Sequence, residues 1–290
     1  MVEYVGDVYR PPGEWRSFIL QATVGCSHNG CTFCGMYKKK QFYIKDMKEI
    51  LGDIQETAGM YNKFEKVFIA DGDAIVIPTE DLLRILYELK KCFPVCRLIS
   101  VYAGPKSTLS KSPEELRDLA KAGLGRAYLG IESGSDAVLK HTNKGVDAET
   151  MLEAGERLRE AGIDLWGIIL IGLGGKAGSE EHIRTTAQLL NRMQPHHLSS
   201  MNYTPVPGTP LYREVEQGSF QVLTAEESLQ ETRYLIEHLQ VPKLHFTSDH
   251  ASNYLPLKGT LPDERARMLD LIDGALSGRV GIRSEDMRGL

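Results

Sequence analysis

SFILQATVGCSHNGCTFCGMY, residues 17–37, joins an apolar run to a loop that carries three cysteines. The run from 17 to 23 combines large apolar and β-branched side chains, which predicts a buried strand. Cys26, Cys31 and Cys34 follow it, with four and then two intervening residues. A loop that leaves a strand can curl around one metal centre. This stretch therefore predicts a metal site directly after the first strand.

The chemistry of the three thiols allows two kinds of metal site. Thiolates are the usual ligands of iron–sulfur clusters, and three of them on a cubane leave one iron without a protein ligand. A structural zinc site usually has four ligands, and His28 within the loop is a candidate for the fourth. Cys92 and Cys96 are too few for a second cluster, and they fall where a helix is expected to run into a strand.

Five more apolar runs follow the cysteine loop, and helical segments separate them. The runs are KVFIA (66–70), RLISVYA (97–103), RAYLGIE (126–132), LWGIILIG (165–172) and HLSSMNY (197–203). The helices are expected near 45–60, 78–92, 112–122, 147–161, 179–193 and 225–239. This alternation indicates βαβ units and a mainly parallel sheet. The fold class is therefore α/β, and six such units predict a partial (β/α)6 TIM-like barrel with a C-terminal extension.

Length and charge limit the class of partner. The 290 residues carry a net charge of −5 without an acidic or basic tail, so nothing points to nucleic acid. The N-terminal sequence lacks the pattern of a signal peptide, and no apolar run approaches the roughly 20 residues of a membrane-spanning helix. We expect a cytoplasmic protein with no membrane partner. We also expect one domain, with a barrel over residues 1–240 and a capping extension over 241–290.

The cysteine loop resembles the motif of the radical S-adenosylmethionine (radical SAM) superfamily. Phe33 matches the aromatic residue that precedes the last cysteine of that motif. The first spacing departs from it, because the usual motif has three intervening residues where this chain has four. The segment YLGIESGSDAVLKHTNKG (128–145) is similar to one shared by oxygen-independent coproporphyrinogen oxidases, the Elongator catalytic subunit and methylthiotransferases.

This resemblance implies a cofactor set and a reaction. The cofactors are a 4Fe-4S cluster on Cys26, Cys31 and Cys34, and S-adenosyl-L-methionine. Reductive cleavage of S-adenosylmethionine gives a 5′-deoxyadenosyl radical, which abstracts hydrogen from a small-molecule substrate. A reduced flavodoxin or ferredoxin would donate the electron. Two alternatives are a tetrapyrrole-related oxidoreductase like the coproporphyrinogen oxidases, and a non-catalytic zinc or iron–sulfur protein.

The resemblance also implies contacts with the cofactor at the ends of the later strands. The residues concerned are Phe33, Gly72, Asp73, Glu132, Ser133, Ile169, Gly172, Val206 and Pro207. Asp73 is expected to accept the amino group of S-adenosylmethionine, and Glu132 to accept its ribose hydroxyls or its ammonium group. The structural alternatives are an ordinary Asp-Gly turn and an ion pair of Glu132 with Lys140 or Lys144.

Candidate catalytic residues are concentrated in LHFTSDHASNYLPLKGTLP, residues 244–262. His245, Asp249, His250 and Tyr254 supply titratable groups beyond the last expected strand. A histidine is the usual proton carrier near neutral pH, and Asp or Tyr can position or exchange protons. The alternative is a structural loop whose side chains bond its own backbone.

Overall fold

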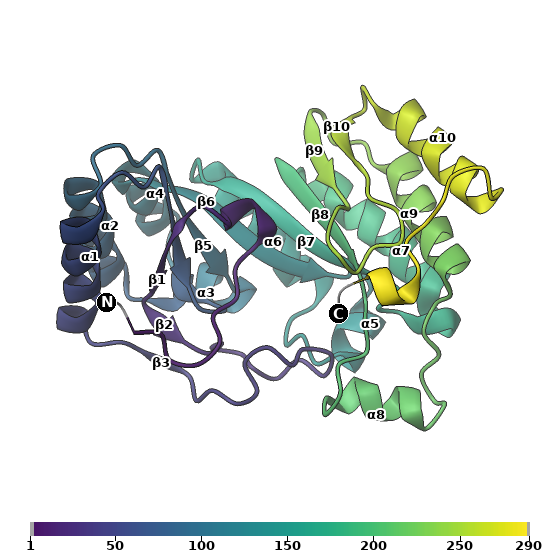
Figure 1. Cartoon of the computed structure of the whole chain (residues 1–290), viewed down its shortest axis with the longest axis horizontal. Coiled ribbons are helices and arrows are strands. Elements are labelled where there is room, and N and C mark those ends of the chain that lie inside the picture. Colours follow the sequence, from purple (N-terminus) through teal and green to yellow (C-terminus); the bar gives the residue numbers. More distant parts are fainter. Residues whose placement is uncertain (1–2, 289–290) are drawn as a thin grey trace. The chain divides into compact units, whose positions relative to one another are not determined.

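The computed structural model describes residues 3–288, which divide into two compact units (Figure 1). Unit 1 comprises the chain up to residue 29 together with 36–129 and 154–165. Unit 2 comprises 30–35, 130–153 and the chain from 166 onward. The expected domain ranges, 1–240 and 241–290, begin and end outside the described residues, and their boundary stays a prediction.

Eight strands form one sheet whose order follows the chain, β1-β4-β5-β6-β7-β8-β9-β10. They are β1 (Phe18–Gln21), β4 (Lys66–Ala70), β5 (Leu98–Ala103), β6 (Leu124–Glu132), β7 (Asp164–Ile171), β8 (His197–Asn202), β9 (Leu244–Thr247) and β10 (Lys258–Leu261). Pairing is parallel from β1 to β6 and from β7 to β9, whereas β10 is antiparallel to β9. The α/β class and the six expected strands are confirmed. Within the described residues the sheet is open, with β1 and β10 as its edges.

Unit 1 contains the helices and turns that come first along the chain. They are α1 (Met47–Met60), α2 (Thr79–Cys92), α3 (Pro105–Leu109), α4 (Pro113–Ala122) and the short turns η1 (Pro12–Glu14) and η2 (Ala74–Val76). α2 contacts both α1 and α4 (Figure 1). The expected capping box starts α4, because Ser112 accepts from the Glu115 N–H while the Glu115 carboxylate accepts from the Ser112 N–H. Gly123 ends this helix in the left-handed conformation, φ 111°.

Unit 2 contains the remaining helices. They are α5 (Asp136–His141), α7 (Gly175–Met193), α8 (Pro210–Glu216), α9 (Ala225–His238), α10 (Arg265–Leu276) and the turn η3 (Glu285–Met287), and α6 (Ala148–Glu160) has residues in both units. α9 contacts α7 and α10 (Figure 1). The capping box predicted at Thr224 and Glu227 is present and begins α9. No helix in residues 3–288 has both the length and the apolar character needed to cross a membrane.

The segment that follows α9 is more regular than its sequence indicates, because β9 and β10 form a hairpin there. β9 ends at Thr247, and side chains of the loop that follows it hydrogen-bond to the backbone of β8. Ser252 Oγ accepts from the Asn202 N–H at 3.2 Å, and Asn253 Nδ2 donates to the Ser200 carbonyl at 2.9 Å. The loop is therefore fixed to β8 rather than free above it.

Candidate functional site

The three cysteines lie in the long connection between β2 (Thr23–Val24) and β3 (Tyr43–Ile44), and all are thiols. Cys26 belongs to unit 1, and Cys31 and Cys34 belong to unit 2. In residues 3–288 no three His, Cys, Asp or Glu side chains are gathered as a preformed metal site. The interpretation of the thiols as ligands therefore depends on their chemistry and spacing.

The turn after β4 lies against Cys26. The Gly72 N–H donates to the Gly25 carbonyl at 3.0 Å. A Cβ on Gly72 would lie 3.0 Å from Cys26 Cβ and 2.6 Å from Cε2 of the Tyr37 ring. Only glycine fits this close approach, so the Gly72 predicted from the sequence lies beside the first cysteine.

Asp73, in the same turn, already has several donors. Its carboxylate accepts from Ser27 Oγ, from the Gly104 N–H at 2.7 Å and from Ser107 Oγ at 2.5 Å. The residue is only 2% exposed. The carboxylate thus joins the cysteine loop to the segment after β5.

Asp71 is a residue that the sequence analysis did not single out. Its buried Oδ2 accepts from Gln21 Nε2 at 3.0 Å, the Gly25 N–H at 3.0 Å and Lys40 Nζ at 2.7 Å. The available signal was an aspartate directly after a buried strand and before a glycine. A buried carboxylate needs such donors and a cation to offset its desolvation.

The second half of the cysteine loop is held by unit 2. The Thr32 N–H donates to the Thr142 carbonyl at 2.9 Å, and the Leu211 N–H donates to the Thr32 carbonyl at 3.0 Å. Phe33 packs against an apolar cluster that includes Leu170 and Tyr203. The predicted aromatic residue therefore fixes the loop between its last two cysteines by burying an apolar ring.

The end of β6 carries two of the predicted contacts. Glu132 has a left-handed backbone, φ 64°, and its carboxylate lies 3.0 Å from Lys144 Nζ. Ser133 is fully buried, donates to Nδ1 of His182 at 2.8 Å and accepts from the Ser135 N–H at 3.0 Å. The ion pair with Lys144 is the structural alternative expected for Glu132, and the Ser133 hydroxyl is committed within the protein.

His182 on α7 joins the ends of β6 and β7. Its Nε2 lies 3.0 Å from the Leu170 carbonyl, which only accepts, so Nε2 carries the proton and Nδ1 accepts from Ser133. Complete burial lowers the pKa of His182 from 6.5 to about 4. The ring is therefore neutral near neutral pH and serves as a structural connector.

The end of β7 is held by a buried carboxylate. Gly172, with φ 81°, donates its N–H to Glu231 Oε2 at 2.8 Å, and Ser179 Oγ donates to Glu231 Oε1 at 2.5 Å. Burial raises the pKa of Glu231 from 4.5 to about 7, although these two donors oppose the rise. Ile169 lies within β7, three residues before Gly172, and is buried.

Val206 and Pro207 follow β8 and are both exposed. A Cβ on Gly35, directly after the last cysteine, would lie 2.7 Å from Val206 Cγ1. The turn after β8 thus packs closely on the end of the cysteine loop. An exposed apolar side chain at this position is available to a ligand.

The structure separates His245 from the other candidate catalytic residues. His245 lies on β9 in register with His197, the first residue of β8, and so at the amino end of the parallel strands. Its exposed ring stacks on His197 at 4.9 Å, and His197 stacks on Trp166 at 4.5 Å. Barrel active sites lie at the opposite, carboxyl ends of the strands.

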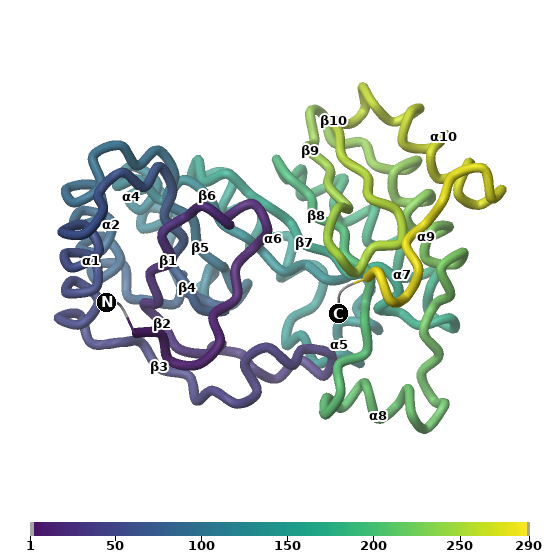
Figure 2. Tube along the Cα trace, in the orientation of Figure 1, coloured from purple at the N-terminus to yellow at the C-terminus, as the bar shows by residue number. Residues whose placement is uncertain are grey.

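The C-terminal segment runs past the loop after β9 (Figure 2). His250 and Tyr254 lie in this loop, where Arg283 donates to the His250 carbonyl and Arg288 to the Tyr254 hydroxyl. His250 Nδ1 accepts from the Ser252 N–H at 3.1 Å, and burial lowers the pKa of the ring. The Tyr254 hydroxyl donates to Glu285 at 2.7 Å, accepts from Arg288 at 2.6 Å, and has its pKa raised to about 12, mainly by burial. Asp249 is exposed beside them. The Tyr254 hydroxyl is therefore bonded within the protein. Asp249 and His250 follow the carboxyl end of β9.

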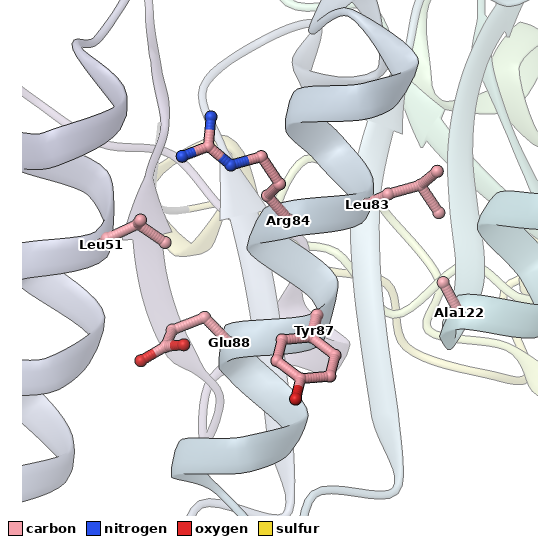
Figure 3. Close-up of a pocket in the computed structure, with 6 residues that line it drawn as sticks. All are labelled: Leu51, Leu83, Arg84, Tyr87, Glu88 and Ala122. Atoms are coloured by element: carbon pink, nitrogen blue, oxygen red, sulfur yellow. The ribbon is translucent and has the colours of Figure 1, made fainter.

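A groove of about 480 Å³ lies on the outer helices of unit 1 (Figure 3). Its lining residues are Leu51, Leu83, Arg84, Tyr87, Glu88 and Ala122. None of these is a predicted site residue, so the groove does not mark the site.

Comparison with known families shows to which superfamily the chain belongs. The family model described as the radical SAM superfamily matches residues 20–190, which is more than half of the chain. The chain belongs to the radical SAM superfamily. Members of this superfamily use S-adenosylmethionine and an iron–sulfur cluster, as the resemblance in the sequence predicted.

The curated relatives of this chain are distant and longer. An anaerobic magnesium-protoporphyrin IX monomethyl ester cyclase of Cereibacter sphaeroides is 25% identical over 226 residues, which are 74% of this chain and 34% of that protein. A tRNA-2-methylthio-N(6)-dimethylallyladenosine synthase of Trichlorobacter lovleyi is 25% identical over 208 residues, 69% of this chain and 47% of that protein. The chain thus spans less than half the length of these relatives.

Solved structures support the fold of the radical SAM chain. The radical SAM coproporphyrinogen III oxidase of Escherichia coli has a TM-score of 0.59 at 18% identity, covering 76% of this chain and 52% of that one. Methylornithine synthase has a TM-score of 0.55 at 15% identity and covers 93% of this chain and 84% of that one. These likenesses confirm the barrel-like fold class.

Proposed function

We propose that this chain uses a 4Fe-4S cluster on Cys26, Cys31 and Cys34 to cleave S-adenosylmethionine reductively, giving a 5′-deoxyadenosyl radical that abstracts hydrogen from a small-molecule substrate. The observation that carries the proposal is three thiols on one loop after the first strand, inside the segment that the family model matches. Thiolate is the usual ligand of iron–sulfur clusters, so the donor set fits the group.

The contacts at the ends of the loops support cofactor-binding roles for several of the predicted residues. Gly72 has no side chain beside Cys26, which allows the backbone to approach a ligand closely. The Glu132 carboxylate is a candidate acceptor for ribose hydroxyls or an ammonium group, and Lys144 positions it. The Ser133 hydroxyl and the Gly172 N–H already bond to buried side chains of α7 and α9, so these two residues would shape the cofactor site by holding its turns rather than by donating those groups to the ligand.

Apolar residues complete the proposed cofactor site. Val206 and Pro207 are exposed on the turn after β8 and are candidates to pack on adenine. Ile169 is buried and would support that surface from within β7. Phe33 keeps the loop in place by its own packing.

Charged and titratable side chains are candidates for contacts with the substrate and with the electron donor. Asp249 and His250 stay candidates for proton transfer to the substrate, since they follow the carboxyl end of β9. Lys38 and Lys39 are exposed next to the cysteine loop and would suit an acidic donor such as reduced flavodoxin or ferredoxin. The cytoplasmic location expected from the sequence stays a prediction.

Two relatives bear on the substrate class without agreeing on it. The Cereibacter protein is named for a tetrapyrrole substrate and the Trichlorobacter protein for a tRNA base, at the same 25% identity. We therefore assign the reaction to the superfamily and propose only hydrogen abstraction from a substrate carbon.

The test is anaerobic reconstitution followed by measurement of bound iron, sulfide and zinc, and of 5′-deoxyadenosine by mass spectrometry after reductant and S-adenosylmethionine are added. We expect about four irons per chain in the wild type and product that Cys31→Ala abolishes. Cys92→Ala, which removes a thiol on α2 outside the loop, is the matched control and should leave both unchanged. One tightly bound zinc with no iron would support the non-catalytic alternative.

A further inference from the structure

Two aspartates hydrogen-bond to the residues on either side of Cys26, the first cysteine of the loop. Asp71 and Asp73 flank Gly72 in the turn after β4, and each bonds a different neighbour of Cys26. Asp71 Oδ2 accepts from the N–H of Gly25, the residue before Cys26, at 3.0 Å. Asp73 accepts from the hydroxyl of the residue after Cys26, Ser27.

The Asp71 side of this arrangement ties the loop at both of its ends. The same Oδ2 accepts from Lys40 Nζ at 2.7 Å, and Lys40 lies near the end of the loop. Both side chains are at most 8% exposed. The ion pair therefore joins the entry and the exit of the loop in a site protected from water, where a charged hydrogen bond is strongest.

The Asp73 side ties the loop to the segment after β5. Gly104 donates its N–H to Oδ1 at 2.7 Å, while Ser27 and Ser107 both donate to Oδ2. A Cβ on Gly104 would lie 2.6 Å from Oδ2, so the backbone there closes over the carboxylate. With three donors and 2% exposure, this carboxylate offers little room for an ammonium group from outside.

We propose that Asp71 and Asp73 are positioning residues that fix the backbone on both sides of Cys26, and that Asp73 does this instead of accepting the amino group of S-adenosylmethionine. The ligand role of Cys26 rests on the proposed function, but the effect of the aspartates on the loop does not. Gly72 completes the arrangement, because its N–H bonds the Gly25 carbonyl and its missing side chain leaves space for Cys26 Cβ.

The first experiment uses cluster-free, reduced protein. Ser27→Ala removes the loop's own donor to Asp73, whereas Ser107→Ala removes a donor to the same carboxylate from outside the loop and is the matched control. Iodoacetamide alkylation of Cys26 is followed by mass spectrometry of its peptide, and each rate is divided by the rate in urea-unfolded protein. We expect roughly tenfold faster alkylation in Ser27→Ala, the size expected for losing one hydrogen bond to a charged acceptor, and a smaller change in Ser107→Ala.

Equal rates in the wild type and Ser27→Ala, or equal effects of the two serine variants, would overturn the proposal. Because no cluster is present, this result is independent of the proposed function, which bound iron in the wild type tests separately.

The second experiment separates the two roles of Asp73. If it positions the loop, Asp73→Asn and Asp71→Asn lose at least half of the bound iron after reconstitution, before S-adenosylmethionine is added. If it accepts the ammonium group, Asp73→Asn keeps full iron and only its affinity for S-adenosylmethionine falls, as measured by equilibrium dialysis. The second outcome overturns the positioning role. Should Asp73→Asn fail to fold, Ser27→Ala is carried through the same two measurements: loss of iron before S-adenosylmethionine is added supports the positioning role, and full iron with lowered affinity overturns it.

Discussion

Burial shifts the pKa values of His182 and Glu231 in opposite directions. Both are buried in unit 2 behind the ends of β6 and β7. The pKa of His182 is lowered to about 4 and that of Glu231 is raised to about 7. In each case the neutral form is favoured, because a charge is costly away from water.

His182→Gln should change the acid stability of the protein. The folded pKa of His182 lies below its ordinary 6.5, so the unfolded chain takes up the proton first as the pH falls. Its contribution to the free energy of unfolding is fully present above pH 6.5. This free energy falls by about 3 kcal/mol as the pH falls to 4. Urea titrations between pH 4 and 7 should show a shallower acid loss in His182→Gln than in the wild type. An identical pH slope would exclude a neutral buried ring.

Glu231→Gln should reveal the opposite slope. The folded pKa of Glu231 lies above its ordinary 4.5, so its contribution to stability is present below pH 4.5 and is lost as the pH rises to 7. The loss is again about 3 kcal/mol. Between pH 4.5 and 6.5 the two groups oppose each other in the wild type. Removing Glu231 should therefore make the free energy of unfolding rise more steeply with pH in that window, and an unchanged slope would contradict the assignment.

Helix α7 fixes the turn after β6 at a glycine. A Cβ on Gly134 would lie 2.4 Å from the Thr185 carbonyl oxygen of α7, and Thr186 Oγ1 accepts from the Gly134 N–H at 2.8 Å. Gly134→Ala must displace helix backbone, so we expect it to destabilise the protein by about 1–3 kcal/mol in urea unfolding. Gly178→Ala, on α7 itself, is the control, since nothing lies within 4 Å of its added Cβ. It should be neutral or stabilise by up to about 1 kcal/mol, and equal losses at both positions would refute the close packing.

The regular elements were predictable because their signals are local. Strand β4 (66–70) has the predicted limits, and both predicted capping boxes are present, since apolar runs and cap residues act over a few positions. Strands β9 and β10 were not predicted. They have four residues each with mixed polarity, and pairing to β8 and to each other decides their structure.

The sequence predicted which residues belong to the candidate site better than it predicted their hydrogen-bond partners. The cysteines, Gly72 and the family follow from residue types and their spacing. The three donors to Asp73 and the commitment of the Ser133 hydroxyl to His182 come from segments far away in the sequence, which spacing cannot reveal.

At the scale of the whole molecule, the segment beyond 240 is part of the core of unit 2. Leu244, Phe246, Leu261, Met268 and Ile272 are all at most 1% exposed. Burying each such side chain is worth about 1.5–3 kcal/mol, and together they match the 5–15 kcal/mol of a typical domain.

A chain ending at residue 240 should therefore fail to fold cooperatively. We expect no sigmoidal melting by circular dichroism and aggregation in size-exclusion chromatography, while the full chain melts cooperatively. A fragment with a cooperative melt and a monomeric elution volume would show that the extension is a separable cap.

The stacked ring at Trp166 gives the molecule an optical property. The chain has two tryptophans, and they divide between the units, with Trp15 in unit 1 and Trp166 in unit 2. Trp15 is already 62% exposed, whereas the Trp166 indole donates to Ser199 at 2.7 Å and lies flat on His197. Intrinsic emission therefore reports mainly on unit 2, and comparing it with the dichroism of the whole backbone reveals whether both units melt as one.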